Sequence, residues 1–130
     1  MKNAFYQNVK FRKSIKYAIN GLKLIVKNER NFRIILAFSV IVISFGLIFQ
    51  ISHFEWIAVF ILISLVFVSE SINSVIEAIC DTVSLEFKVN IKYAKDVSAG
   101  AVLVSSLVSV IAGLIIFIPY IIDLLQLFIK

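Results

Sequence analysis

The stretch FVSESINSVIEAICDTVSLEFK, residues 67–88, begins inside a strongly apolar run and then places three carboxylates and one amide within twelve residues. They are Glu70, Asn73, Glu77 and Asp81, at relative positions 0, +3, +7 and +11. At 100° per residue, an α-helix keeps these four within about 80° of arc, so they form one polar stripe. Ionisable side chains at membrane depth are costly and mark functional sites by default. The stretch therefore predicts a membrane helix whose last turns carry a functional site on one face.

The composition places the whole chain in the class of integral membrane proteins. It has 130 residues, of which 61% are hydrophobic and 16% charged, and its mean hydropathy is +1.01. An ordinary soluble domain is about half apolar, and a soluble core of this length could not hide so many aliphatic side chains. The length allows one small domain, residues 1–130. The single cysteine, Cys80, excludes an internal disulfide framework and a cysteine-based metal cluster.

Hydropathy divides the chain into a basic N-terminal segment and three apolar runs. Residues 10–27 carry apolar and basic side chains on opposite faces at helical spacing, which predicts an amphipathic helix lying in the membrane surface. It belongs to a cytoplasmic or interfacial segment, residues 1–33. Transmembrane helices are expected over 34–51, 56–81 and 97–122, because each run is long enough to cross a bilayer. The expected fold is an all-α membrane protein with one surface helix and three transmembrane helices.

The distribution of lysine and arginine predicts how these spans are oriented. Residues 1–33 carry nine of them and residues 82–96 carry three, whereas the turn at 52–55 carries none. Cytoplasmic loops are enriched in Lys and Arg, so the N-terminus and the 82–96 loop are expected in the cytoplasm. The 52–55 turn then lies outside, where His53 and Glu55 are expected to be solvated. A basic segment beside an apolar run favours an anionic membrane surface as its partner over nucleic acid.

The acidic stripe has the composition of a magnesium and phosphate site. Glu29, at the end of the surface helix, must approach the same level before the first span begins. Carboxylate oxygens suit Mg²⁺, which takes one or two of them and shares its other positions with phosphates and water. A further carboxylate can act as general base toward an alcohol. The 82–96 loop adds charged side chains at this face: Glu86, Lys88, Lys92, Lys95 and Asp96.

A structural interpretation of the same residues stays open. The acids could pair with Lys92, Lys95 or Arg33 and only tie the helices together, and for Asp81 such a role at the helix end is our expectation. A rival functional class is a transporter or channel subunit. That class would place polar groups near the middle of the membrane and repeat them in two halves. Here the acids gather at one end of a span and no internal repeat is present.

The twelve residues ESINSVIEAICD, 70–81, resemble the signature of the small prokaryotic diacylglycerol kinase family, Glu-x-φ-Asn-Ser/Thr-x-φ-Glu-x-x-φ-Asp with φ apolar. Three further segments match that family in order and spacing: YAINGL at 17–22, NERNFR at 28–33 and AKD at 94–96. The resemblance runs from about residue 10 to about residue 115. It implies a homotrimeric integral-membrane lipid kinase of the bacterial inner membrane, multi-pass with a cytoplasmic N-terminus.

The resemblance also implies roles for individual residues. The family transfers the γ-phosphate of ATP to a membrane lipid alcohol, with Mg²⁺ as cofactor. Glu70 matches the catalytic base, and Glu29 and Glu77 match the metal-binding carboxylates. The positions that match the ATP site are Lys10, Tyr17, Asn73, Glu86, Lys88, Lys95 and Asp96. Because three thin helices cannot enclose such a site alone, we expect neighbouring subunits to share it.

Two lipid alcohols compete as acceptor, undecaprenol and diacylglycerol. The segment NERNFR and the long basic helix before it resemble the undecaprenol kinase branch of the family. That branch often has histidine two positions after the arginine, whereas this chain has Ile35. Both acceptors therefore stay open.

Overall fold

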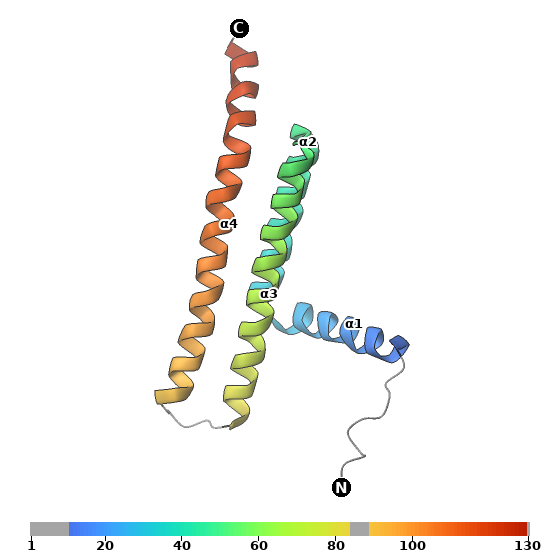
Figure 1. Ribbon diagram of the computed structural model, residues 1–130, viewed down its shortest axis with the longest axis vertical. Helices are drawn as coiled ribbons and strands as arrows, with labels where there is room; N and C mark the ends of the chain where they lie inside the picture. Colours follow the sequence, from blue (N-terminus) through green and yellow to red (C-terminus); the bar gives the residue numbers. More distant parts are fainter. Residues whose placement is uncertain (1–10, 84–88, 130) are drawn as a thin grey trace.

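Four α-helices make up the part of the chain that the computed structural model describes, residues 11–83 and 89–129. They are α1 (Phe11–Asn28), α2 (Arg30–Phe49), α3 (His53–Val83) and α4 (Val89–Ile129). Figure 1 shows α2, α3 and α4 running side by side along the molecule, while α1 projects away from them to the side. These three helices, which alternate in direction, are each long and apolar enough to cross a membrane. The architecture is that of an all-helical, multi-pass membrane protein.

The helices continue beyond the apolar runs on which the sequence analysis was based. The segment 82–96, expected as a loop, is helical at both ends, because α3 continues to Val83 and α4 begins at Val89. At 1.5 Å per residue, the 41 residues of α4 measure about 60 Å, roughly twice the thickness of a hydrocarbon core. α4 is therefore longer than one bilayer crossing requires, and it continues beyond the expected span 97–122 at both ends.

A sharp corner separates α1 from α2. Glu29 stands between them with extended backbone angles, φ −95° and ψ 115°. Arg33, one turn into α2, donates from Nη1 to the carbonyl oxygens of Val26 at 3.1 Å and Lys27 at 2.9 Å. These carbonyls belong to the last turn of α1, where C=O groups receive no hydrogen bond from within the helix and carry the partial negative charge of the helix dipole. The guanidinium thus caps α1 from α2 and fixes the corner at which Glu29 lies.

The turn between α2 and α3 is also closed by specific contacts. Gln50 adopts the left-handed conformation, φ 51°, and the backbone N–H of Ile51 donates to the carbonyl of Gly46 at 3.2 Å. Ser52 and Glu55 form a capping box: the Ser52 backbone N–H donates to Glu55 Oε2 at 2.7 Å, and the Glu55 N–H contacts Ser52 Oγ at 3.4 Å. Tyr120 of α4 donates its hydroxyl to the same Glu55 oxygen at 2.8 Å. Glu55 thus lies at the solvent-facing turn, as expected, and also ties that turn to α4.

The best-packed part of the bundle lies next to this turn. Its buried residues are Ile51, Val59, Ile116 and Phe117. Phe45 and Phe49 of α2 contact Phe117 of α4, with ring centroids 6.3 Å and 6.2 Å apart. Most other large aliphatic side chains are exposed on the surface of the chain, as expected for helices that face hydrocarbon. The core thus holds α2, α3 and α4 together at the end opposite the acidic stripe.

Candidate active site

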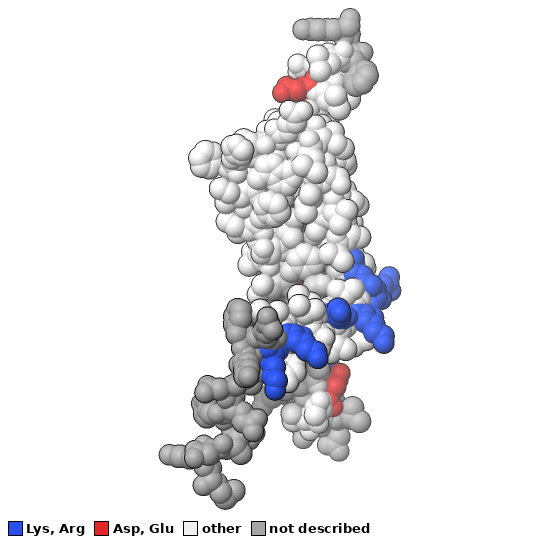
Figure 2. Space-filling view, turned by 90° about the vertical axis from the view of Figure 1, so that its right-hand side faces the viewer, with Lys and Arg blue, Asp and Glu red and all other residues white. Residues whose placement is uncertain are grey.

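Charged side chains gather at the end of the bundle that we call the basic end, formed by α1, the last turns of α3 and the first turns of α4. On the face that Figure 2 shows, the lysine and arginine side chains lie toward this end and none covers the apolar middle. The polar stripe of α3 also lies at the basic end. The buried polar residues here are Glu70, Asn73 and Ser98. Polar atoms are therefore concentrated at one end of the apolar body.

Glu70 is the most deeply buried large side chain in the described chain. It is 2% exposed, on α3, one turn beyond the buried Val66. Asn31, in the first turn of α2, hydrogen-bonds its carboxylate, and the carboxylates of Glu29 and Glu77 are close enough to act on it electrostatically. The corner between α1 and α2 thus brings two residues of the NERNFR segment to Glu70, the first member of the α3 stripe.

Asn73, Glu77 and Ser98 form a hydrogen-bonded chain across α3 and α4. Asn73 Nδ2 donates to Glu77 Oε1 at 3.1 Å, one turn further along α3. Ser98 Oγ, on α4, donates to Asn73 Oδ1 at 2.7 Å and also lies 3.0 Å from the carbonyl oxygen of Lys95. Asn73 is 7% exposed and Ser98 is 6% exposed, whereas the Glu77 side chain is exposed. The buried amide therefore holds one oxygen of an accessible carboxylate.

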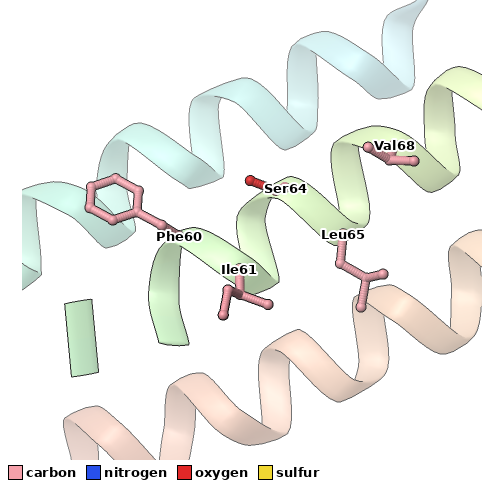
Figure 3. Close-up of a pocket in the computed structure, with 5 residues that line it drawn as sticks. All are labelled: Phe60, Ile61, Ser64, Leu65 and Val68. Atoms are coloured by element: carbon pink, nitrogen blue, oxygen red, sulfur yellow. The ribbon is translucent and has the colours of Figure 1, made fainter. Parts of the chain in front are cut away.

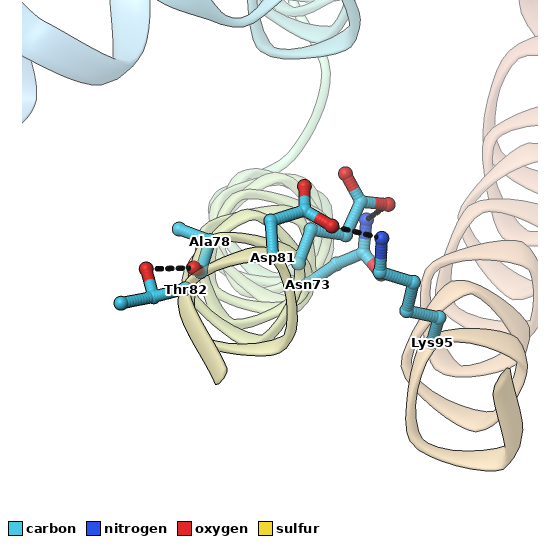
Figure 4. Close-up of polar contacts among 6 residues, drawn as sticks. Asn73, Ala78, Asp81, Thr82 and Lys95 are labelled. Atoms are coloured by element: carbon cyan, nitrogen blue, oxygen red, sulfur yellow. Dashed lines mark hydrogen bonds and ion pairs between the residues drawn. The ribbon is translucent and has the colours of Figure 1, made fainter. Parts of the chain in front are cut away.

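Lys95 pairs with Asp81, the last member of the acidic stripe. The ammonium Nζ lies 2.6 Å from Asp81 Oδ1, and Figure 4 shows the pair bridging α3 and α4. The side chains of Lys95 and Asp81 are 36% and 62% exposed, so solvent screens the attraction. The expected structural role of Asp81 at the helix end agrees with this contact. Lys95 keeps two further N–H donors for another anion.

The remaining expected site residues lie apart from this cluster or outside the described residues. Tyr17 is on α1 and 64% exposed. It is twelve residues before Glu29, which corresponds to about 18 Å along a helix. Asp96 is exposed on the first turns of α4. Lys10, Glu86 and Lys88 lie outside the residues that the structure describes.

The carboxylates present at the basic end fit a cation that shares its ligands with a phosphate compound. Glu29 is half-buried at the helix corner and Glu77 is exposed on α3. Within residues 11–83 and 89–129, no three acidic, histidine or cysteine side chains come together as a closed metal site. Mg²⁺ is commonly bound by one or two carboxylates, with phosphates and waters completing an octahedron. Glu29 and Glu77 are the residues that would hold it.

Two residues of this site were not anticipated from the sequence, Asn31 and Ser98. Asn31 lies within the NERNFR segment, two positions after Glu29, but the sequence alone indicates no role for this side chain. Ser98 lies three residues after Lys95, on the same face of α4. Neither spacing reveals the partner on another helix, since that depends on how the helices are packed.

An apolar groove leads from the middle of the bundle toward Glu70. It lies between α2 and α4 over α3 and has a volume of about 530 Å³. The side chains that line it include Ile34, Phe38, Val42, Val66, Val110 and Ile116. Of the three serines that line it, two use their hydroxyl protons on backbone carbonyls: Ser39 Oγ lies 2.8 Å from the Ile35 oxygen, and Ser109 Oγ lies 2.8 Å from the Ser105 oxygen. The third, Ser106, leaves the groove at most one hydroxyl donor among otherwise apolar side chains. The groove is therefore a surface for hydrocarbon.

A second, open depression lies on α3 alone. Figure 3 shows the five residues that line it, all from one stretch of this helix: Phe60, Ile61, Ser64, Leu65 and Val68. Of these, Ile61 is 61% exposed and Val68 is 57% exposed. The depression is separate from the polar cluster, because Val68 is two positions before Glu70 and thus on a different face of the helix.

Comparison with known proteins relates this arrangement to one family. The model of the prokaryotic diacylglycerol kinase family matches residues 16–117. The undecaprenol kinase of Bacillus subtilis (strain 168) is 36% identical over 110 residues, which cover 85% of this chain and 89% of that protein. The diacylglycerol kinase of Synechocystis sp. (strain ATCC 27184 / PCC 6803 / Kazusa) is 34% identical over 128 residues, covering 95% of this chain and 71% of that protein. The matched region contains α2, α3 and most of α1 and α4, including every residue of the cluster around Glu70. The chain therefore belongs to the prokaryotic diacylglycerol kinase family.

Proposed function

We propose that the protein phosphorylates a membrane lipid alcohol, using ATP and Mg²⁺, at the cytoplasmic face of the bacterial inner membrane. The observation that carries this proposal is the position of Glu70. Its buried carboxylate lies one helical turn beyond Val66, which lines the apolar groove, and within electrostatic reach of the carboxylates of Glu29 and Glu77. A lipid in the groove and a nucleotide at the basic end would meet at this side chain. Each substrate could then react without leaving its own phase.

In the proposed reaction Glu70 is the general base. Its carboxylate accepts the proton of the lipid hydroxyl as the alcohol oxygen bonds to the γ-phosphorus of ATP and the bond to the β–γ bridging oxygen breaks, which yields lipid phosphate and ADP. Lys95 stabilises charge that develops on the phosphate oxygens. Glu29 and Glu77 would hold Mg²⁺, which when bound neutralises negative charge on the phosphates. The other proposed ATP contacts are Lys10, Tyr17, Asn73, Glu86, Lys88 and Asp96.

The groove favours an acceptor with a purely hydrocarbon chain. The ester carbonyls of diacylglycerol need hydrogen-bond donors when they are taken out of water. Two of the three serines that line the groove, Ser39 and Ser109, already donate to backbone carbonyls, so only Ser106 could serve the two ester groups. Undecaprenol has no ester group, so the groove suits it better. The similarity to a Bacillus undecaprenol kinase supports the same choice, and diacylglycerol is the second candidate because the Synechocystis relative carries that name.

Charge supports the proposed orientation in the membrane. The basic end carries the lysines of α1 and of the start of α4, as expected for the cytoplasmic side. On α1, Ile15, Ile19 and Leu22 are between 44% and 59% exposed at helical spacing. We propose that these side chains enter the membrane surface while the lysines of α1 face water. The whole chain, residues 1–130, then forms one membrane domain with its N-terminus in the cytoplasm.

A homotrimer with shared sites would explain two features of the single chain. Tyr17 lies about 18 Å along α1 from Glu29, so in one chain it is remote from the Glu70 cluster. The depression at Phe60–Val68 is an exposed apolar stripe with one small residue, Ser64, suited to packing against another helix. In a trimer, α1 of one subunit could complete the site of the next.

The decisive experiment supplies both lipids side by side. Purified protein in mixed micelles would receive ATP labelled at the γ-phosphate, with undecaprenol or diacylglycerol, with and without Mg²⁺. Label is expected in undecaprenyl phosphate, dependent on Mg²⁺, and to a lesser extent in phosphatidic acid. If neither lipid is phosphorylated at any Mg²⁺ concentration, the kinase proposal fails and a transporter or channel subunit becomes the better reading.

A further inference from the structure

We infer that Ser98 is a positioning residue for the reaction: it fixes the amide of Asn73 and, through that amide, the carboxylate of Glu77. The inference rests on the proposed function only in taking Glu77 as a ligand of the divalent cation. Nothing in the family signature contains Ser98, which lies on α4, 25 residues from Asn73. Its effect would be transmitted across the contact between the two helices.

The three residues form one directed chain of hydrogen bonds. Ser98 Oγ lies 2.7 Å from Asn73 Oδ1, and Asn73 Nδ2 lies 3.1 Å from Glu77 Oε1. Ser98 and Asn73 are both buried, at 6% and 7% exposure. Because water is excluded from these two side chains, their polar atoms depend on each other for partners. The Asn73 amide therefore has one hydrogen-bond partner on each side, Ser98 at its oxygen and Glu77 at its nitrogen.

The charge of Glu77 determines which way the Asn73 amide points. An ionised carboxylate only accepts hydrogen bonds, so the amide NH₂ must face Glu77 and the amide oxygen must face Ser98. A serine hydroxyl has a single proton, and two acceptors lie near it, Asn73 Oδ1 at 2.7 Å and the Lys95 carbonyl at 3.0 Å. The shorter contact is the one to Asn73. Ser98 thus donates to the amide oxygen of Asn73, while the amide nitrogen donates to Glu77.

The consequence is a carboxylate with one oxygen held and the other available. Glu77 Oε1 accepts from Asn73, so Oε2 and the remaining lone pair of Oε1 can bind a cation. The Glu77 side chain is exposed and would otherwise sample several rotamers. Outer-shell hydrogen bonds of this kind orient metal ligands, and their loss typically weakens metal binding 10- to 100-fold. Without its hydroxyl partner, the Asn73 amide is free to rotate and its hold on Glu77 weakens.

The test compares Ser98→Ala with Ser98→Thr and with Ser105→Ala. Ser105 is a matched control, since it is also buried on α4 but its hydroxyl bonds to the carbonyl of Val102 in its own helix, at 2.9 Å. The readout is binding of Mn²⁺ to purified protein with a non-hydrolysable ATP analogue, followed by electron paramagnetic resonance. A parallel measurement is the Mg²⁺ concentration that gives half-maximal lipid phosphorylation.

We expect Ser98→Ala to weaken Mn²⁺ binding about tenfold and to raise the half-maximal Mg²⁺ concentration similarly. Ser98→Thr, which keeps the hydroxyl, and Ser105→Ala should stay within about twofold of wild type. A merely structural Ser98 would lower the unfolding temperature without changing Mn²⁺ affinity, and that result would overturn the inference. Failure of the wild-type protein to phosphorylate either lipid would instead refute the proposed function, while the Mn²⁺ comparison would still decide the role of Ser98.

Discussion

The ammonium group of Lys95 on α4 lies 2.6 Å from the carboxylate of Asp81 on α3, so the acidic stripe ends in an ion pair between helices. The stripe thus divides into two parts. Glu70 and Asn73 are buried, whereas Asp81 is 62% exposed. An exposed pair contributes little to stability, but it keeps the lysine close to the basic end. The main effect of the ion pair is therefore to hold the Lys95 ammonium near the proposed phosphate site.

Replacing Asp81 with asparagine should therefore affect nucleotide binding more than stability. We expect the free energy of unfolding to change little, because solvent screens an exposed ion pair. The KM for ATP should rise a few-fold, since Lys95 would no longer be held beside the phosphate site. Steady-state kinetics in mixed micelles and thermal unfolding by circular dichroism measure the two effects. A loss of several kcal/mol with unchanged KM would show that the pair only ties the helices together.

Replacing Glu70 with glutamine should abolish most of the activity and leave the fold intact. The amide keeps the shape of the side chain and costs less to bury than a carboxylate, so stability should be unchanged or higher. A lost general base typically reduces the rate 10²- to 10⁴-fold. Phosphorylation of undecaprenol by the variant, measured with labelled ATP, checks this.

The control for Glu70→Gln is Asp123→Asn, a carboxylate exposed near the other end of α4. It should retain the wild-type rate, because it lies far along α4 from the basic end. Wild-type activity of Glu70→Gln would show that another group takes the proton and that the assignment of the base is wrong.

The sequence predicted the helices and the acidic stripe because both depend on local periodicity. Apolar runs of sufficient length specify spans, and the spacing of Glu70, Asn73 and Glu77 places them on one face whatever surrounds the helix. The ends of α3 and α4 were less predictable. Polar residues between 82 and 96 suggested a loop, yet a helix can continue into water wherever its side chains tolerate solvent.

Contacts between helices were not predictable in the same way. Ser98 is 25 residues from its partner Asn73, and Tyr120 is 65 residues from its partner Glu55. Each pairing depends on how far one packed helix is shifted along the other. A change of one residue in that shift would rotate each side chain by 100°. The S-x-x-E pattern at Ser52 could have identified the capping box, but nothing local indicates that Tyr120 completes it.

Replacing Tyr120 with phenylalanine should destabilise the end of the bundle that lies away from the active site. The variant removes the hydroxyl that donates to Glu55 Oε2 at 2.8 Å, while the ring keeps its contact with Phe49. A hydrogen bond to a charged group is stronger than one between neutral groups, but solvent at this turn weakens it, so we expect a small and measurable fall in the free energy of unfolding. Chemical denaturation in detergent measures it. Lipid phosphorylation below the unfolding temperature should be unaffected, and a selective loss of activity would contradict this.

Replacing Gly46 with alanine should introduce a collision with Trp56. A Cβ atom at Gly46 would lie 2.8 Å from the Trp56 ring, which is closer than van der Waals contact permits. Such overpacking costs about 1–3 kcal/mol. The double variant with Trp56→Phe should recover part of the loss, and this coupling is read from a double-mutant cycle of unfolding free energies. Gly100→Ala is the control, because nothing lies within 4 Å of its Cβ position.

Replacing Gly113 with leucine should block the groove without disturbing the packed core. Gly113 lines the groove, and a Cβ atom there meets no other atom within 4 Å, so a larger side chain has space to enter. If the groove holds the lipid chain, the added side chain competes with it, and the KM for undecaprenol should rise several-fold at unchanged KM for ATP. Leucine at Gly100, which also has open space but does not line the groove, should leave both constants near wild type. Equal effects of the two leucines on the lipid KM would mean that the acceptor binds elsewhere on the bundle.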